Sequence, residues 1–298
     1  MGDCQLSDKK SQYCKRTSFD QLFIAADASS AGGKTDERYN KKKMLNRQEF
    51  LQCIVKAACM KYVESGDIVD VSEALHRLLS ADIEGRLDPK VFVEPNDFRK
   101  SHLYSEPVDK ALRQHESSLR LIFDRLTKLK GQNAAAGIAN KMVSFEVWKE
   151  FTRLFELCDV DITERHVTLA FLWGRMKVVD EQLERTRVKL THMTFEDFLE
   201  GVCRLAAYKA FPTDDELAAS EYASAGEYVY RLRGEAPEDY ENMVKARARP
   251  WGAQPLLRLE RSVEHMCSLL IVTAQQGNGE DASALDEKEA ASFIPNAK

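Results

Sequence analysis

No stretch of this chain is long and apolar enough to cross a membrane. The longest apolar candidate, residues 266–274, falls well short of the roughly 18 to 20 residues that a transmembrane helix requires. The N-terminal region also lacks the apolar core of a signal peptide. We therefore expect a cytoplasmic protein without a transmembrane segment.

The chain lacks the cysteine spacing of a metal site or of a disulfide framework. It has 7 cysteines, an odd number, and several of them fall within apolar patterns of helical period. Such cysteines are typical of reduced thiols that fill the core of a cytosolic protein.

An excess of positive charge is also missing. The 43 basic and 48 acidic residues give a formal net charge of −5, which argues against nucleic acid as the main partner. The share of hydrophobic residues is ordinary at 44% of 298 residues, enough to bury a core in one large or two smaller domains.

A catalytic constellation is not recognisable. Residues 28–35 (ASSAGGKT) fit a relaxed phosphate-loop pattern, but a working phosphate loop precedes a helix with an apolar face. Residues 36–43 (DERYNKKK) provide no such face, so a flexible Gly/Ser-rich loop is the better interpretation. His115 and Glu116 have no nucleophile in their pattern, which favours a structural histidine. We expect no enzyme.

What the sequence does contain is an internal repeat. Its copies are residues 45–60 (LNRQEFLQCIVKAACM), 143–158 (VSFEVWKEFTRLFELC) and 193–208 (MTFEDFLEGVCRLAAY). Each copy begins with an aliphatic residue, has an aromatic residue five positions later and continues with apolar residues at helical spacing. The repeat predicts three amphipathic helices.

The apolar faces of these helices supply the candidate packing residues. In the first copy, Phe50 and Ile54 begin a stripe with a four-residue spacing, a pattern that is typical of core. The residues that we expect to pack the units together, or to line a groove for a partner, are Phe50, Ile54, Trp148, Phe195, Phe198 and Val202.

Further helices are expected between and after the repeats. Capping patterns predict helix starts at Asp70 with Glu73, Asp161 with Glu164, and Thr213 with Glu216, the last helix running towards Leu232. One long helix should follow Ser105, because its apolar stripe continues to Leu129. Residues 82–104 should form an irregular crossing segment pinned by Phe92 and Phe98, and residues 255–274 a final amphipathic helix.

These patterns divide the chain into five parts. They are a flexible basic N-terminus (1–17), a first helix-loop-helix unit with its crossing segment (18–104), a pair of such units (105–211), a C-terminal helical extension (212–274) and a disordered acidic tail (275–298).

The repeat resembles the EF-hand-like proteins of flagellate and algal protists, over about residues 18–211. In an EF-hand, loop position 8 pairs with its counterpart across a two-stranded contact, position 12 closes the calcium site and an aromatic residue opens the exiting helix. The resemblance puts Leu45, Val143 and Met193 at position 8, and Glu49, Val147 and Asp197 at position 12. It implies an all-α fold of paired EF-hand-like units with additional C-terminal helices.

The loops before these residues are poor in calcium ligands. Calcium takes about six to eight oxygens, mostly from loop carboxylates. Residues 38–49 place cations at ligand positions, residues 136–147 offer no carboxylate, and residues 186–197 offer Asp197 alone. If a longer first loop begins at Asp27, then Asp27 and Glu49 are the one pair that could share an ion, weakly because the long loop loses more entropy on ordering.

Two classes of function follow. The favoured one is a non-catalytic interaction or scaffold protein without a cofactor, whose helices hold a partner helix in an apolar groove. The protist resemblance suggests that the partner belongs to a cytoskeletal or flagellar assembly. The alternative is a calcium-binding regulatory protein, with calcium as its cofactor.

Overall fold

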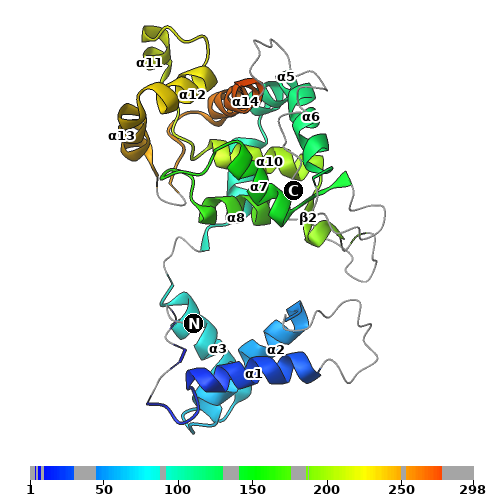
Figure 1. The fold of residues 1–298 in the computed structure, drawn as a ribbon. Helices are drawn as coiled ribbons and strands as arrows, with labels where there is room; N and C mark the ends of the chain where they lie inside the picture. The colour runs from blue at the N-terminus through cyan, green and yellow to red at the C-terminus, as the bar shows by residue number, and fades with distance from the viewer. Residues whose placement is uncertain are drawn as a thin grey trace. The chain divides into compact units, whose positions relative to one another are not determined.

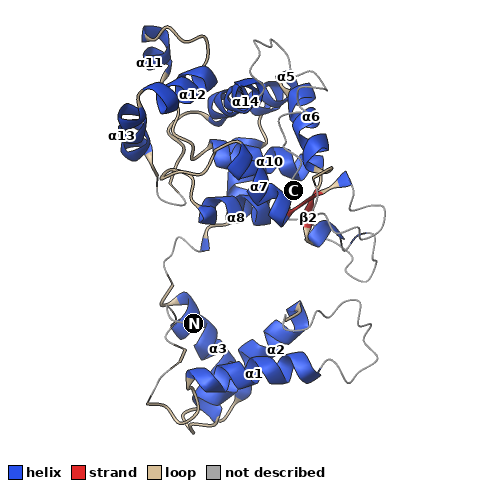
Figure 2. Cartoon of the chain, in the orientation of Figure 1, coloured by secondary structure: helices blue, strands red, loops and turns tan. Residues whose placement is uncertain are grey.

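The chain forms two compact units, Met1–Val93 and Glu94–Lys298. The computed structural model describes residues 4, 6–7, 10–29, 45–87, 92–129, 141–175, 186, 188–249 and 253–276. Over these residues the fold is all-α, with one two-stranded sheet (Figure 1 and Figure 2). The boundary between the units falls inside the predicted crossing segment, 82–104.

The first unit is built from helices α1 (Arg16–Ser29), α2 (Arg47–Ala58) and α3 (Val71–Arg77). Two π-helical turns, η3 (Cys59–Val63) and η4 (Leu78–Glu84), continue α2 and α3. As predicted, Asp70 caps α3, accepting a hydrogen bond from the Glu73 N–H at 2.9 Å. The core centres on Phe19, Ala58, Tyr62 and Leu78, so α1, η3 and η4 close around α2 and α3.

A buried carboxylate joins the two π-helical turns. Asp82 is 2% exposed, accepts a hydrogen bond from the Tyr62 hydroxyl and lies 2.8 Å from Lys61 Nζ. Burial, together with this hydrogen bond, raises the pKa of Tyr62 to about 12. Burial alone would raise the pKa of Asp82, but its bonds with Lys61 and Tyr62 lower it. The charged carboxylate therefore fastens η4 to η3.

The second unit holds most of the helices. They are α4 (Pro95–Phe98), η6 (Arg99–Leu103), α5 (Glu106–Gln114), α6 (Glu116–Leu126), α7 (Phe145–Leu154), α8 (Glu164–Gly174), η8 (Val188–Leu190), α10 (Phe195–Ala206), α11 (Asp214–Ala219), α12 (Ala225–Glu235), α13 (Pro237–Arg247) and α14 (Leu259–Gln276). Its strands are β1 (Val143–Ser144) and β2 (His192–Met193).

Helix α10 lies at the centre of this unit and packs against α6, α8 and α14 (Figure 1). It is buried on nearly every side, as expected for a helix enclosed by others. The surrounding core includes the fully buried Trp148 and Phe151 of α7. The Trp148 indole N–H donates a hydrogen bond to the Val167 carbonyl at 2.9 Å, which ties α7 to α8.

The strands join the starts of the second and third repeat copies. β1 and β2 are antiparallel, with Val143 opposite Met193 and Ser144 opposite His192. Val143 and Met193 are fully buried. The register therefore pairs the two residues that the EF-hand resemblance places at loop position 8.

The predicted long helix after Ser105 is wrong, because it is two helices. α5 ends and α6 begins at His115, whose φ of −110° and ψ of 9° leave the helical range. The apolar stripe is still buried, from Val108 to Leu126. α5 packs on α14, whereas α6 packs on α7 and α10, so the bend lets each half face its own partner.

Several other element predictions also needed correction. Residues 95–103 are helical, because Pro95 occupies the first turn of α4, where its missing N–H costs nothing. Phe92 is 50% exposed and does not anchor the segment as predicted, whereas Phe98 packs against the core. The helix begun by Thr213 and Glu216 ends at Ala219, and α13 was not predicted.

Asp161 does not cap α8. Thr163 is the cap, and its backbone N–H donates to His166 Nδ1 at 3.1 Å. Asp161 is fully buried and instead pairs with Lys209 Nζ at 3.1 Å, a nitrogen that also lies 3.3 Å from the Tyr240 hydroxyl. The pair thus connects the turn before α8 to the segment after α10, and the Lys209–Tyr240 contact extends the connection to α13.

The final helix and the cysteines agree with the sequence. α14 begins at Leu259, four residues after the predicted start, and Leu256 is outside it and 46% exposed, but its apolar residues Leu259, Val263, Met266 and Leu270 are all buried. All 7 cysteines are free thiols, and four of them are buried. Within the part of the chain that the structure describes, no helix is long and apolar enough to span a membrane.

Candidate functional site

The two position-12 acids are buried at the starts of their own helices. Glu49 is 1% exposed and Asp197 is 3% exposed. The Asn46 backbone N–H donates to Glu49 Oε2 at 2.7 Å, and the Thr194 backbone N–H donates to Asp197 Oδ2 at 2.9 Å. The cap side chains return the bond, with Asn46 Oδ1 accepting from the Glu49 N–H at 2.9 Å. Both acids therefore complete capping boxes.

This geometry bears directly on calcium. A position-12 carboxylate would have to offer both oxygens to the ion, but one oxygen of each acid already accepts a backbone N–H. In the second copy Val147 has no carboxylate, and Ser144 caps α7 by accepting the Val147 N–H at 3.3 Å. The same local arrangement, a helix cap, recurs in all three copies.

Asp27, the other proposed calcium ligand, lies in the last turn of α1 and is partly buried. α1 packs on α2, which carries Glu49. Among the described residues, no three His, Cys, Asp or Glu side chains are grouped so that they could hold a metal ion. The Asp27–Glu49 calcium pair stays a prediction.

Only the start of the phosphate-loop-like segment is described. Ala28 and Ser29 belong to the end of α1, and the remainder of residues 28–35 lies outside the described residues.

Four of the candidate packing residues lie in the core of the second unit. Trp148, Phe195, Phe198 and Val202 are all at most 5% exposed. The Phe198 ring meets Trp148 edge to face at 5.9 Å between ring centroids, and it meets Phe151 at 5.3 Å. These side chains join α7 to α10, so they serve packing and are not accessible to a partner.

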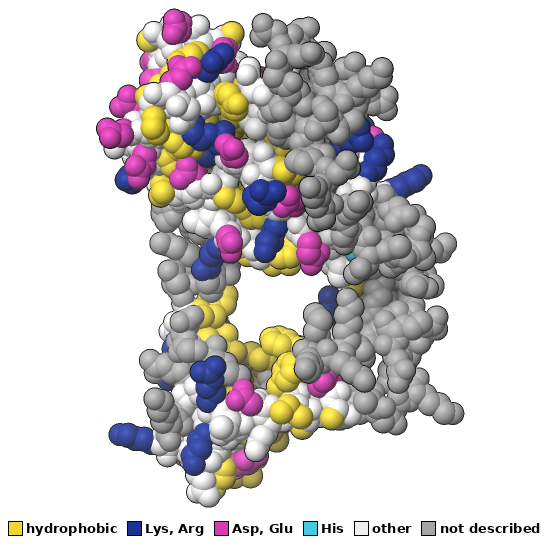
Figure 3. All heavy atoms as spheres, viewed as in Figure 1, with side chains coloured by type: hydrophobic (Ala, Val, Ile, Leu, Met, Phe, Trp, Pro, Cys, Tyr) yellow, Lys and Arg dark blue, Asp and Glu magenta, His cyan; other side chains and the backbone are white. Residues whose placement is uncertain are grey.

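The first repeat copy behaves differently: the expectation that Phe50 lies in the core is wrong, whereas Ile54, the other predicted packing residue there, packs against the core of the first unit. Phe50 is 55% exposed, Leu51 57% and Val55 36%, while Ile54 is half-buried. The buried residues of α2 are Glu49, Ala57 and Ala58. We call Phe50, Leu51, Ile54 and Val55 the α2 stripe. Hydrophobic side chains are visible on this unit in Figure 3.

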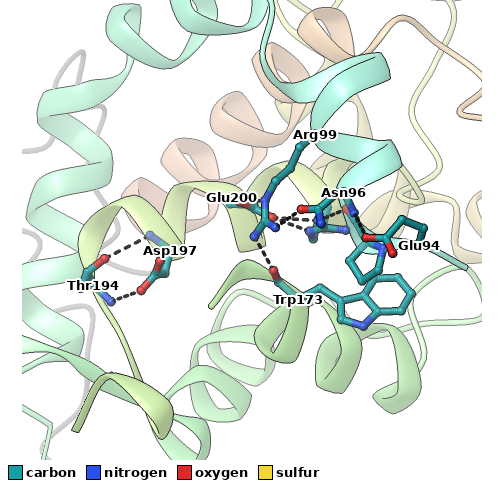
Figure 4. Close-up of polar contacts among 9 residues, drawn as sticks. Glu94, Asn96, Arg99, Trp173, Thr194, Asp197 and Glu200 are labelled. Atoms are coloured by element: carbon teal, nitrogen blue, oxygen red, sulfur yellow. Dashed lines mark hydrogen bonds and ion pairs between the residues drawn. The ribbon is translucent and has the colours of Figure 1, made fainter. Parts of the chain in front are cut away.

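A buried charge network in the second unit was not anticipated from the sequence. Arg99 Nε donates to Glu200 Oε2 and Arg204 Nε donates to Glu200 Oε1, both at 2.9 Å (Figure 4). Arg99 also donates to the Asn96 side-chain carbonyl at 2.8 Å and to the Trp173 backbone carbonyl at 2.7 Å. We call Arg99, Glu200 and Arg204 the arginine triad.

The arginine triad joins three distant parts of the chain. Arg204 reaches the Pro95 carbonyl at 2.8 Å, and its guanidinium lies 4.7 Å from the Phe98 ring centroid. Burial lowers the pKa of Arg204, against the opposing effect of Glu200. The triad therefore fixes α4 and η6 to α8 and α10. The four-residue spacing of Glu200 and Arg204 is visible in the sequence, but Arg99 lies in a segment expected to be irregular.

A pocket of about 770 Å³ lies beside the arginine triad, between η6 and α5 on one wall and α10 on the other. Leu103, Leu112 and Leu199 contribute apolar surface. The lining carboxylates are Glu106 and Asp109 from α5, and Glu196, Asp197 and Glu200 from α10. Arg99 is the one cation among the lining residues, and it is bound by Glu200.

Comparisons of the chain with protein-family models, with curated proteins and with solved structures gave no match. The function therefore depends on the chemistry of these surfaces.

Proposed function

We propose that this protein is a non-catalytic helical interaction protein, and that its first unit binds a partner helix through the α2 stripe. The observation that carries this proposal is that Phe50 and Leu51, on a capped helix, are 55% and 57% exposed. Single exposed apolar residues are common on protein surfaces, but adjacent large ones at helical spacing mark interaction sites.

The spacing of the α2 stripe suits a helical partner. Positions 50, 51, 54 and 55 lie along one side of α2, which is the arrangement used when two amphipathic helices pack together. α1, which packs against α2, also has exposed apolar residues, with Ile24 64% exposed and Phe23 36% exposed. Complete burial of a Phe or Leu side chain contributes about 1.5 to 3 kcal/mol, so the stripe offers useful binding free energy.

The cellular setting is proposed from the resemblance alone. If the chain is an EF-hand-like protein of the protist type, its partner belongs to a cytoskeletal or flagellar assembly. The Val143–Met193 pairing and the three helix caps support that family proposal. The alternative, a calcium-binding regulatory protein, requires a site at Asp27 and Glu49, and the capping bond of Glu49 weighs against it.

Proximity labelling in the source cell tests the proposed function. The full chain is compared with a Phe50→Ser, Leu51→Ser variant and with a matched control, Val69→Ser, which changes a side chain that is 92% exposed outside α2. We expect a defined set of labelled proteins that disappears with the double variant and persists with the control. If all three proteins label the same partners, the partner does not bind through the α2 stripe. If the labelled proteins include no cytoskeletal or flagellar component, the proposed assembly is wrong.

A further inference from the structure

We propose that the pocket beside the arginine triad is a second binding site, which takes a basic amphipathic segment of another protein. Aliphatic side chains of that segment would pack on the apolar floor, and a Lys or Arg would meet the carboxylates at the rim. This inference goes beyond the proposed function, because it concerns another unit and a partner of different chemistry.

The floor provides the apolar contact. Leu103 is buried, and Leu112 and Leu199 are partly buried against the core. The volume of about 770 Å³ exceeds what one side chain needs and falls within the roughly 300 to 1,000 Å³ usual for ligand sites. The pocket can therefore receive several neighbouring side chains of a peptide.

The rim supplies the charge. Glu106 and Asp109 lie on the α5 wall and the exposed Glu196 lies on the α10 wall, whereas Asp197 is buried and holds the start of α10. Glu106 and Asp109 form ion pairs with Lys110 and Arg113, but these pairs link side chains that are 58% to 77% exposed, and such pairs contribute little. A partner cation can replace them.

The charges around the pocket also argue against a phosphate or a metal ion as its ligand. The arginine triad has one formal positive charge in excess, but both arginines are turned to Glu200, Asn96 and backbone carbonyls. A phosphate would therefore face the rim carboxylates. The rim acids also do not come together as a metal-binding group in the described part of the chain. A cation on a long aliphatic stem suits both the floor and the rim.

The arginine triad makes the pocket a formed site before any partner arrives. It fastens the α4–η6 segment to α10, and these elements contribute Asn96, Arg99, Leu103 and Leu199 to the lining. Because little has to be ordered on binding, less of the interaction free energy is lost to conformational entropy.

A synthetic leucine–lysine amphipathic helix, labelled with a fluorophore, is the probe, and a leucine–glutamate helix of equal length is its charge-reversed control. Fluorescence anisotropy measures binding to the full chain and to Glu196→Lys, Leu199→Ala and Glu238→Lys. Glu238 is the matched control, because it too is an exposed acid in the first turn of a helix of the second unit. A Phe50→Ser, Leu51→Ser variant tests whether the peptide binds to the α2 stripe instead of the pocket. Circular dichroism confirms that each variant is folded.

We expect the lysine peptide to bind and the glutamate peptide not to bind. Glu196→Lys should weaken binding at least about tenfold, Leu199→Ala should weaken it several-fold, and Glu238→Lys should change it less than about twofold. The proposal is overturned if the lysine peptide does not bind or if Glu196→Lys and Glu238→Lys have equal effects. It is also overturned if binding is lost in the α2 stripe variant alone.

Discussion

A carboxylate in the first turn of a helix can bind an ion or can hold the helix start, and one oxygen cannot do both well. In both Glu49 and Asp197, one carboxylate oxygen accepts a hydrogen bond from a backbone N–H at the start of the helix. Each bond satisfies a backbone N–H that would otherwise lack a partner inside the helix. The position-12 acids are thus explained by local helix energetics, whether or not the chain descends from a calcium-binding protein.

Substitution of Glu49 distinguishes these two uses. Glu49→Ala should lower the free energy of unfolding of the first unit by about 1 kcal/mol, because the capping box loses one of its two bonds. Addition of calcium should change the melting temperature of neither protein. Thermal denaturation with calcium and with chelator measures both effects. Calcium-dependent stabilisation of the wild-type chain, absent in Glu49→Gln, would establish the regulatory alternative.

His265 gives the second unit a pH dependence. It is 4% exposed beside the Phe211 ring, at 5.5 Å between ring centroids, and its Nε2 has no hydrogen-bond partner. Burial, reinforced by Arg261 and opposed by Asp214 and Glu264, lowers the pKa of His265 to about 4. The unfolded chain, with a histidine pKa of about 6.5, therefore binds more protons than the folded chain between these two values.

The free energy of unfolding should accordingly fall as the pH decreases from about 6.5 towards 4, by about 2 kcal/mol for this residue after allowance for solvent screening. Burial also lowers the pKa of His115, His166 and His192, so the comparison must be with a variant. Urea unfolding of the wild-type chain and of the His265→Leu variant at several pH values provides this comparison. Equal pH slopes for the two proteins would show that His265 titrates normally.

At the scale of helices, the contact between α12 and α14 depends on Gly226. A Cβ atom there would lie 2.3 Å from the Ser268 carbonyl carbon, so the two backbones approach too closely for any other residue. The Ser268 hydroxyl also donates to Ser224 Oγ at 2.8 Å, just before α12 begins. α12 thus packs onto α14 backbone to backbone at Gly226.

Two glycines of the same helix make a matched pair. Gly226→Ala should destabilise the second unit by about 2 kcal/mol or more, because backbone must move to admit the methyl group. Gly234→Ala has nothing within 4 Å of its new Cβ and should stabilise α12 by about 0.5 to 1 kcal/mol. Chemical denaturation of both variants tests this. Similar changes for the two would contradict the close contact.

Local signals in the sequence predicted much of this architecture, and long-range contacts account for what it missed. Asp70 and Thr213 cap helices as predicted, because a cap and its partner are three residues apart. Phe50 begins an apolar stripe, but the helical spacing of apolar residues does not show which of them a neighbouring helix covers. The break at His115 reflects different partners for α5 and α6, and the Arg99–Glu200 bond spans 101 positions. Contacts between residues so far apart in the sequence produce no periodic pattern, so the sequence could not predict them.

At the scale of the whole molecule, the two units have separate hydrophobic cores. Tyr62 and Leu78 belong to the core of the first unit, and Trp148 and Phe198 to that of the second. Each unit should therefore lose stability on its own when its own core or charge network is damaged. All 3 tryptophans of the chain, Trp148, Trp173 and Trp251, fall within residues 94–298, so tryptophan fluorescence reports on this range and not on the first unit.

Arg99→Ala tests this separation. It removes the bonds to Glu200, Asn96 and Trp173 and leaves the buried Glu200 with Arg204 alone, so we expect a loss of about 3 kcal/mol in the second unit. Tryptophan fluorescence in urea should show the earlier transition, while hydrogen exchange of α2 and α3 stays unchanged. Arg113→Ala, which removes an exposed pair with Asp109, is the control and should leave the fluorescence transition where it is in the wild-type chain. If exchange in α2 and α3 accelerates together with the fluorescence change, the two units unfold as one, because damage to one core has then been transmitted to the other.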